Sequence, residues 1–163
     1  MMNKKLAATT IFGAVVATAL LGSRFTPAAG TQTGDWYRRQ RKSPLNPPDA
    51  VFAPVWTTLY ALMAIAAYRV WRAREGESRS SALRLWAAQL ALNAAWSPLF
   101  FGAKKPAIAF VDLLALLGAQ AAFVRKSNRV DRAAAWLFAP YIAWVMFAAH
   151  LNLEIIRRNE SIT

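Results

Sequence analysis

The 163-residue chain contains no cysteine and only one histidine. Without cysteine it can form neither a disulfide framework nor a thiolate metal site, and one imidazole argues against a histidine-rich metal centre or a Ser-His-Asp triad. Charged residues are scarce at 17%, against about 25% in an average soluble domain, while hydrophobic residues reach 56%. This apolar content excludes intrinsic disorder, and we predict no bound metal.

The few charges are mostly positive, with 20 Lys and Arg against 8 Asp and Glu, for a net charge of +12. A protein that binds nucleic acid would carry such charge throughout its length. Here the charges form clusters separated by long uncharged stretches. We therefore interpret them as anchors to lipid headgroups, and nucleic acid is not an expected partner.

The uncharged stretches are long enough to cross a membrane, because about 20 apolar residues in a helix span about 30 Å of hydrocarbon. They lack the alternating polarity of barrel strands, which are about ten residues long. The prediction is an all-α integral membrane bundle of five transmembrane helices, forming one domain over residues 1–163. The expected helices cover residues 5–24, 48–72, 81–102, 105–126 and 131–157, with a long first loop at 25–47.

The first apolar run has two interpretations. Lys4 and Lys5 precede it as in a signal peptide, whereas Arg24 closes it like an interfacial anchor. The residues alone leave cleavage and retention open. Orientation is also open, because eleven Lys and Arg fall on the N-terminal side of a five-helix bundle and nine on the other, a small margin in favour of a cytoplasmic N-terminus.

Seven tryptophans are many for a chain of this length. Trp71 and Trp86 are interpreted as belt residues at the membrane interface. Three others, Trp56, Trp96 and Trp144, lie well inside or near the start of their apolar runs. These three are candidates for a ligand site, with ordinary core packing as the alternative.

Helical spacing places polar and aromatic residues together. Trp56 and Tyr60 share a face of the second predicted helix, and Asn93, Trp96 and Phe100 share a face of the third. An amide among indoles suits a flat aromatic ligand with a few polar atoms. A hydrogen bond between helices is an equally good explanation for Asn93.

Asp112 is the one acidic residue inside an apolar run. Ionisable groups at membrane depth are functional candidates, although a pair with Lys105 or a neutral carboxyl would also account for it. The third predicted helix also carries a series of small residues that would permit close helix approach, about 200° from Asn93 around the helix. The predicted dimer interface comprises Ala87, Ala91 and Ala95.

Three blocks of sequence follow one another along the chain. The first comprises Trp36-Tyr37, Lys42, Asn46-Pro47-Pro48 and residues 51–60, the second residues 92–102 with Val111-Asp112, and the third residues 140–144 with Leu151-Asn152 and Arg157. In content and order they resemble the TspO/MBR family of bacterial tryptophan-rich sensory proteins, which are related to the mitochondrial translocator protein, the peripheral benzodiazepine receptor.

The resemblance implies a retained first helix, a five-helix bundle whose first loop covers a ligand pocket, and often a homodimer. It implies a multi-pass protein of the bacterial cell envelope, inner or outer membrane undecided, that contacts membrane lipid. It further implies binding of protoporphyrin IX or haem as a ligand, with no required cofactor. The positions matching the pocket are Tyr37, Pro47, Trp56, Tyr60, Asn93, Trp96, Phe100 and Trp144.

Three functions follow as expectations. The leading one is a tetrapyrrole-binding protein acting as sensor, regulator or transporter, with first-loop bases as candidate contacts for propionates: Arg38, Arg39, Arg41 and Lys42. The second is light-dependent porphyrin degradation, which the resemblance attributes to Trp56 and Trp144 as catalytic residues. The third is a small carrier of lipophilic compounds, supported by Asp112. Cholesterol recognition is expected to be weak or absent, because Leu153 replaces the aromatic of the cholesterol pattern.

Overall fold

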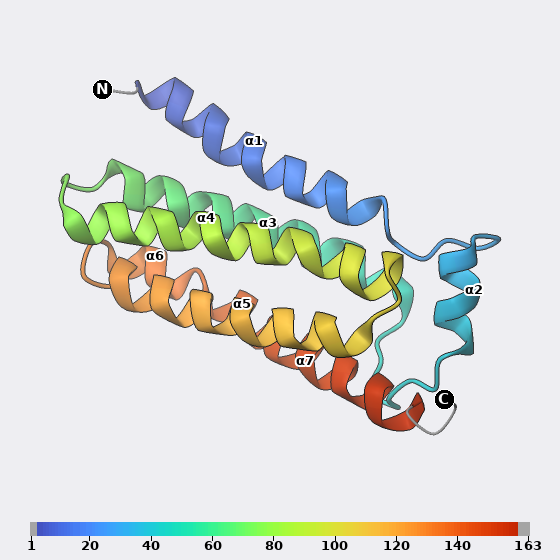
Figure 1. The fold of residues 1–163 in the computed structure, drawn as a ribbon. Coiled ribbons are helices and arrows are strands. Elements are labelled where there is room, and N and C mark those ends of the chain that lie inside the picture. Colours follow the sequence, from blue (N-terminus) through green and yellow to red (C-terminus); the bar gives the residue numbers. More distant parts are fainter. Residues whose placement is uncertain (1–2, 160–163) are drawn as a thin grey trace.

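The computed structural model describes residues 3–159, which form an all-helical bundle without strands (Figure 1). From the second long helix onward, short connections make successive long helices antiparallel neighbours. The elements in chain order are α1 (Lys4–Ser23), α2 (Gln32–Arg39), α3 (Asp49–Arg72), α4 (Glu77–Ser97), the π-helical turn η1 (Pro98–Gly102), α5 (Pro106–Ser127), α6 (Arg132–Trp136) and α7 (Ala139–Asn159).

Four segments of the described chain are long and apolar enough to cross a membrane: α1, α3, α5, and α6 with α7 taken together. The predicted all-α class is therefore confirmed, and the count by length and composition is four rather than five. α4 has a comparable length of 21 residues but is less apolar, because Glu77, Arg79 and Arg84 lie in its first half.

The helices pack as two layers with α1 on the outside (Figure 1). α4 and α5 form the most extensive pair, α5 also packs against α7, and α1 contacts α3 and α4. The central core contains side chains from all of these helices, among them Ile11, Met63, Leu90, Phe123 and Val145. α3 contacts α6 at one end of the bundle, whereas farther along it faces α7 across an open groove.

The first loop contains a helix, α2, that the apolar pattern did not predict. Thr31 caps its start by accepting a hydrogen bond from the Gly34 N–H at 3.0 Å. Gly34 is required there, because a Cβ on it would overlap the backbone carbonyl of Ala28. The turn that starts α2 therefore depends on one glycine.

Two predicted helices differ in detail from those observed. The third begins four residues earlier, at Glu77, and its last residues from Pro98 form a π-helical turn in which the Ala103 N–H donates to the Pro98 carbonyl at 2.7 Å. The fifth is interrupted between Trp136 and Ala139, where Pro140 cannot donate an N–H to the preceding turn. The interruption turns Trp136 outward, with 66% of its surface exposed.

Candidate functional site

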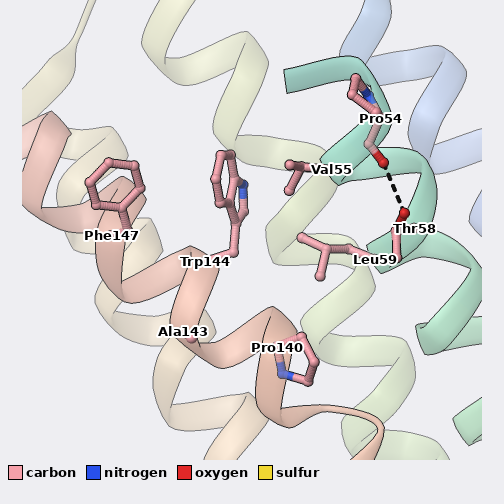
Figure 2. Close-up of a pocket in the computed structure, with 8 residues that line it drawn as sticks. All are labelled: Pro54, Val55, Thr58, Leu59, Pro140, Ala143, Trp144 and Phe147. Atoms are coloured by element: carbon pink, nitrogen blue, oxygen red, sulfur yellow. Dashed lines mark hydrogen bonds between the residues drawn. The ribbon is translucent and has the colours of Figure 1, made fainter. Parts of the chain in front are cut away.

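An open groove of about 540 Å³ lies between α3 and α7 (Figure 2). Trp144 and Phe147 project from α7 on one side, opposite α3 on the other. The wall is almost entirely apolar, and the Thr58 hydroxyl is occupied by donating to the Pro54 carbonyl at 3.0 Å. The groove is lined by Pro54, Val55, Thr58, Leu59, Pro140, Ala143, Trp144 and Phe147.

Aromatic rings continue from the groove into the bundle. Phe52 meets Trp144 edge-on, with ring centroids 5.8 Å apart. Trp56 lies against Tyr60 at 5.4 Å and meets Tyr141 edge-on at 6.2 Å. Because Tyr141 and Trp144 are three residues apart on α7, they lie on neighbouring turns of one face. Predicted residues Trp56 and Tyr60 thus pack together beside Tyr141. Predicted residue Trp144 lines the groove and is in ring contact with Phe52 and Phe147.

A buried hydrogen-bonded triad connects Tyr60 and Tyr141 to α4. The Tyr60 hydroxyl donates to Oδ1 of Asn93 at 3.0 Å, and Nδ2 of Asn93 donates to the Tyr141 hydroxyl at 2.9 Å. Tyr141 is fully buried and Asn93 is 8% exposed. Of the two explanations for Asn93, the structure shows the bond between helices: its amide joins α3, α4 and α7.

A second aromatic cluster lies beneath the first loop. Trp96 stacks on Phe100 with centroids 4.9 Å apart, and Trp36 and Tyr37 of α2 meet Phe100 edge-on at 5.6 and 6.4 Å. Phe100 is 2% exposed, so the protein's own rings fill this space. Predicted residues Tyr37, Trp96 and Phe100 therefore lie together, in a cluster separate from the groove.

A pair of hydrogen bonds holds this cluster to the start of α5. The Trp96 indole N–H donates to Oδ1 of Asn152 at 3.3 Å, and Nδ2 of Asn152 donates to the Pro106 carbonyl at 2.8 Å. Asn152 is 2% exposed. This amide, like Asn93, links helices rather than facing an open space.

The end of α7 fastens the first loop. The Arg41 N–H donates to Oδ1 of Asn159 at 3.1 Å, and Nδ2 of Asn159 donates to the Arg41 carbonyl at 3.2 Å. One side chain thus binds both polar groups of one loop residue. We refer to this pair of bonds as the Asn159 clamp.

Inside the loop, Tyr37 organises its neighbours. Its hydroxyl donates to Oδ1 of Asn46 at 3.4 Å, and the Lys42 ammonium lies 4.3 Å from the centre of its ring. Burial raises the pKa of Tyr37, as does the charge of Asp49, while the bond to Asn46 acts in the opposite direction. Predicted Pro47 is half-buried, and its carbonyl accepts from Nδ2 of Asn46 at 3.1 Å.

The basic residues of the first loop differ in their partners. Arg38 forms an exposed ion pair with Asp35, and Lys42 covers Tyr37. The side chains of Arg39 and Arg41 have no ion-pair or hydrogen-bond partner within residues 3–159 and are exposed. These two are the better-placed contacts for an anionic group approaching the loop.

The remaining candidates line neither the groove nor the aromatic cluster beneath the first loop. Asp112 is buried, and its Oδ2 has no hydrogen-bond partner in the described part of the chain; no ion pair to Lys105 forms there. Of the small residues on α4, Ala87 and Ala91 are exposed and Ala95 is half-buried.

Sequence reasoning missed some functional neighbours and misplaced one tryptophan. Tyr141 and Trp36 were in the quoted motifs, and Tyr141 lies three residues before Trp144, a spacing that could have identified it. The interfacial interpretation of Trp86 is wrong: it is 7% exposed, and its indole N–H donates to the Met63 carbonyl at 3.1 Å.

The bundle and its aromatic groove define a multi-pass helical membrane protein with a site open to its flank. The family model of the TspO/MBR family matches residues 11–158. The chain is 42% identical over 142 residues to the translocator protein of Ovis aries, covering 86% of this chain and 82% of that protein. It is 38% identical over 141 residues to the tryptophan-rich sensory protein of Cereibacter sphaeroides, covering 86% and 87%. It is 35% identical over 164 residues to the tryptophan-rich protein TspO of Chlorobaculum tepidum, covering 97% and 99%. The chain belongs to the TspO/MBR family.

Proposed function

We propose that this chain binds a tetrapyrrole such as protoporphyrin IX or haem, and acts as a sensor, regulator or transporter of porphyrins in a bacterial cell envelope. Under this proposal α4 is the fifth membrane span. The observation that carries it is the groove between α3 and α7, whose volume of about 540 Å³ is typical of small-molecule sites and whose wall presents an indole. The names of the relatives, translocator and sensory protein, agree with transport and sensing alike.

The chemistry of the groove fits a flat, mostly apolar ring. Trp144 offers an indole face, and Phe52 and Phe147 meet its ring at 5.8 Å and hold its orientation. Pro54 and Pro140 carry no backbone N–H, so the wall presents few donors. Since the groove opens on the flank of the helices, a lipophilic ligand can enter from the bilayer.

The first-loop bases are distant from this ligand position. The Asn159 clamp holds Arg41 fifteen residues beyond Trp144 along α7, which is about 22 Å of helix. A ring stacked on Trp144 therefore keeps its carboxylates away from Arg41 while the clamp is closed. Contact with Arg39 or Arg41 would require a second position beneath the first loop, where Trp96 and Phe100 now fill the space.

The test is a titration of the purified protein with protoporphyrin IX in nanodiscs, reading the dissociation constant from porphyrin absorbance. Trp144→Ala should weaken binding about tenfold or more, since loss of an aromatic stack and its buried area costs about 1.4 kcal/mol or more. Trp71→Ala is the matched control, because Trp71 is also half-buried but stacks on Tyr68 at the other end of α3. Absence of binding, or equal weakening in both variants, contradicts the proposal.

A second candidate is light-dependent porphyrin degradation. Trp56 and Trp144 are oxidisable; Trp144 lines the groove, and Trp56 packs against Tyr60 and Tyr141. Illumination of the bound complex in air separates the two functions. A porphyrin spectrum that stays unchanged under light removes the catalytic alternative, and a decay abolished by Trp144→Phe supports it.

Two further proposals concern carriage and assembly. A carrier of lipophilic compounds would use the buried carboxyl of Asp112, so Asp112→Asn should abolish uptake of such compounds into vesicles. The exposed faces of Ala87 and Ala91 suit a homodimer, which Ala91→Phe should disrupt as measured by light scattering. Cholesterol should bind weakly or not at all, because Leu153 provides no aromatic ring.

A further inference from the structure

A second groove, of about 560 Å³, lies on the same flank of the bundle, where α3 passes α6 and the start of α7. It shares Pro140 with the aromatic groove, and its other lining residues are not among those assigned above to tetrapyrrole binding. We refer to it as the interfacial groove. It is lined by Leu62, Ile65, Arg69, Ala133, Trp136, Leu137 and Pro140.

The interfacial groove is apolar along its length and polar at one end. Leu62, Ile65 and Leu137 form its walls, and Ile65 is 42% exposed. Arg69 lies in the last turn of α3, and Trp136, 66% exposed, lies at the end of α6. An exposed indole beside an arginine at a helix end is the arrangement found at the boundary between hydrocarbon and headgroups.

Asp131 holds Arg69 in position, and part of the hydrogen-bonding capacity of its guanidinium remains available. Its Nη2 lies 3.1 Å from Oδ2 of Asp131, and its Nε and Nη2 donate to Oδ1 of Asp131 at 3.3 Å. Nη1 makes no hydrogen bond within residues 3–159, and 46% of the side chain is exposed. A guanidinium carries five N–H donors, so an anionic oxygen can still bind it.

The charge around this end favours an anionic occupant. The helix ends and loops on this side carry eleven Lys and Arg but only three acidic residues, Glu75, Glu77 and Asp131. Exposed Arg72 and Arg132 lie close in sequence to Arg69 and Asp131. The carboxylate of Asp131 offsets one of these charges, and the balance remains strongly positive.

We propose that the interfacial groove binds one anionic phospholipid. Its phosphate contacts Arg69 and the Trp136 indole N–H, and one acyl chain lies along Ile65 and Leu62 toward Pro140. Arg69 and Leu62 are seven residues apart, about 10 Å along the helix, within the roughly 15 Å that one leaflet supplies. This proposal does not depend on tetrapyrrole binding, and it still holds if the protein binds no tetrapyrrole.

The experiment measures quenching of Trp136 by brominated lipids. The protein is placed in phosphatidylcholine nanodiscs that contain a small mole fraction of dibromo-phosphatidylglycerol or dibromo-phosphatidylcholine. The Trp136 signal is the difference between wild type and Trp136→Phe, a change at an exposed side chain. Saturable quenching by the anionic lipid, at mole fractions where the zwitterionic lipid quenches little, is the expected result.

Two matched pairs of variants test the site itself. Arg69→Gln should weaken the anionic lipid about fivefold, the effect of one basic residue near a membrane surface. Arg158→Gln should leave it unchanged, because Arg158 is also an exposed, ion-paired arginine but lies at the other end of the bundle. Ala133→Leu, which fills the groove without altering charge, should displace the lipid, whereas Ala107→Leu on the exposed face of α5 should not.

Three outcomes overturn the proposal. Equal quenching by both lipids makes the groove an unselective part of the lipid boundary. Equal loss of anionic-lipid binding in Arg69→Gln and Arg158→Gln shows that the preference comes from the overall surface charge and not from this groove. Quenching that appears only when the protein is diluted to monomers shows that a second copy of the chain covers Trp136.

Discussion

Replacing Asn93 by leucine, which is similar in volume, should destabilise the protein in the absence of any ligand. The substitution removes the bond from the Tyr60 hydroxyl and the bond to the Tyr141 hydroxyl. Bonds between membrane helices average about 0.6 kcal/mol each, which gives about 1.2 kcal/mol for the pair. Leaving the fully buried Tyr141 hydroxyl without its partner raises the expected loss toward about 3 kcal/mol.

The measurement is unfolding by dodecyl sulfate from mild detergent micelles, followed by circular dichroism. Tyr60→Phe should cost less than Asn93→Leu, because it breaks only one of the two bonds. The double variant should be more stable than the sum of the single losses by about 0.6 kcal/mol. Asn128→Leu is the control, since Asn128 is exposed and its side chain makes no hydrogen bond in the described chain.

The same variants distinguish a structural amide from a ligand-binding one. Because two tyrosines occupy the Asn93 amide, Asn93→Leu should change the protoporphyrin dissociation constant by less than about threefold once the protein is folded. A stable Asn93→Leu variant that has lost porphyrin binding would refute this reasoning. It would show that the amide serves the ligand and that the tyrosine bonds contribute nothing measurable to the fold.

Three further perturbations have defined outcomes. Gly34→Ala should disorder α2, because the added Cβ meets a backbone carbonyl; proteolysis of the first loop should become faster while the unfolding of the bundle is unchanged. Asn152→Ala should lower the free energy of unfolding by about 1–3 kcal/mol, because it leaves the Trp96 indole N–H and a carbonyl of α5 without their hydrogen-bond partner. Desolvation acts to raise the pKa of Asp131, but bonds from the α6 backbone and Arg69 outweigh it and lower that pKa. The stabilisation from this carboxylate is therefore complete above its ordinary pKa of about 3.9 and is lost as the pH falls through the lowered value, so Asp131→Asn should flatten the loss of stability measured in acid.

The membrane spans could be predicted from sequence because the bilayer imposes one simple requirement, about 20 apolar residues in a helix. This requirement could not predict α2, because a polar helix of eight residues lies outside the hydrocarbon. Its start was nevertheless readable in the cap residue Thr31 and in Asp35 of its first turn. Trp86 was misplaced because α4 begins at Glu77, so this side chain lies more than two turns inside the helix rather than at its end.

The separation of the candidate residues into a groove and a loop cluster could not be predicted. Helical spacing shows which face of its helix a residue occupies, but not which residues of another helix lie beside it. Phe52, near the start of α3, meets Trp144, so the last turns of α7 extend past α3 and reach the first loop. That offset separates Trp144 from Trp96 and Phe100. The family resemblance implied that all three line one pocket.

The Asn159 clamp has a consequence for the rate at which anything passes beneath the first loop. Opening the loop at Arg41 breaks two hydrogen bonds, each with a net contribution of about 0.5–1.5 kcal/mol. At about 2 kcal/mol, the clamp by itself limits the open form to at most roughly 3% of the molecules, and the apparent affinity of a ligand that requires it falls by at least the same factor. The groove between α3 and α7 requires no such opening. A lipophilic molecule therefore reaches Trp144 from the bilayer without a conformational delay, and one that must pass the loop from the aqueous side waits for a minor state.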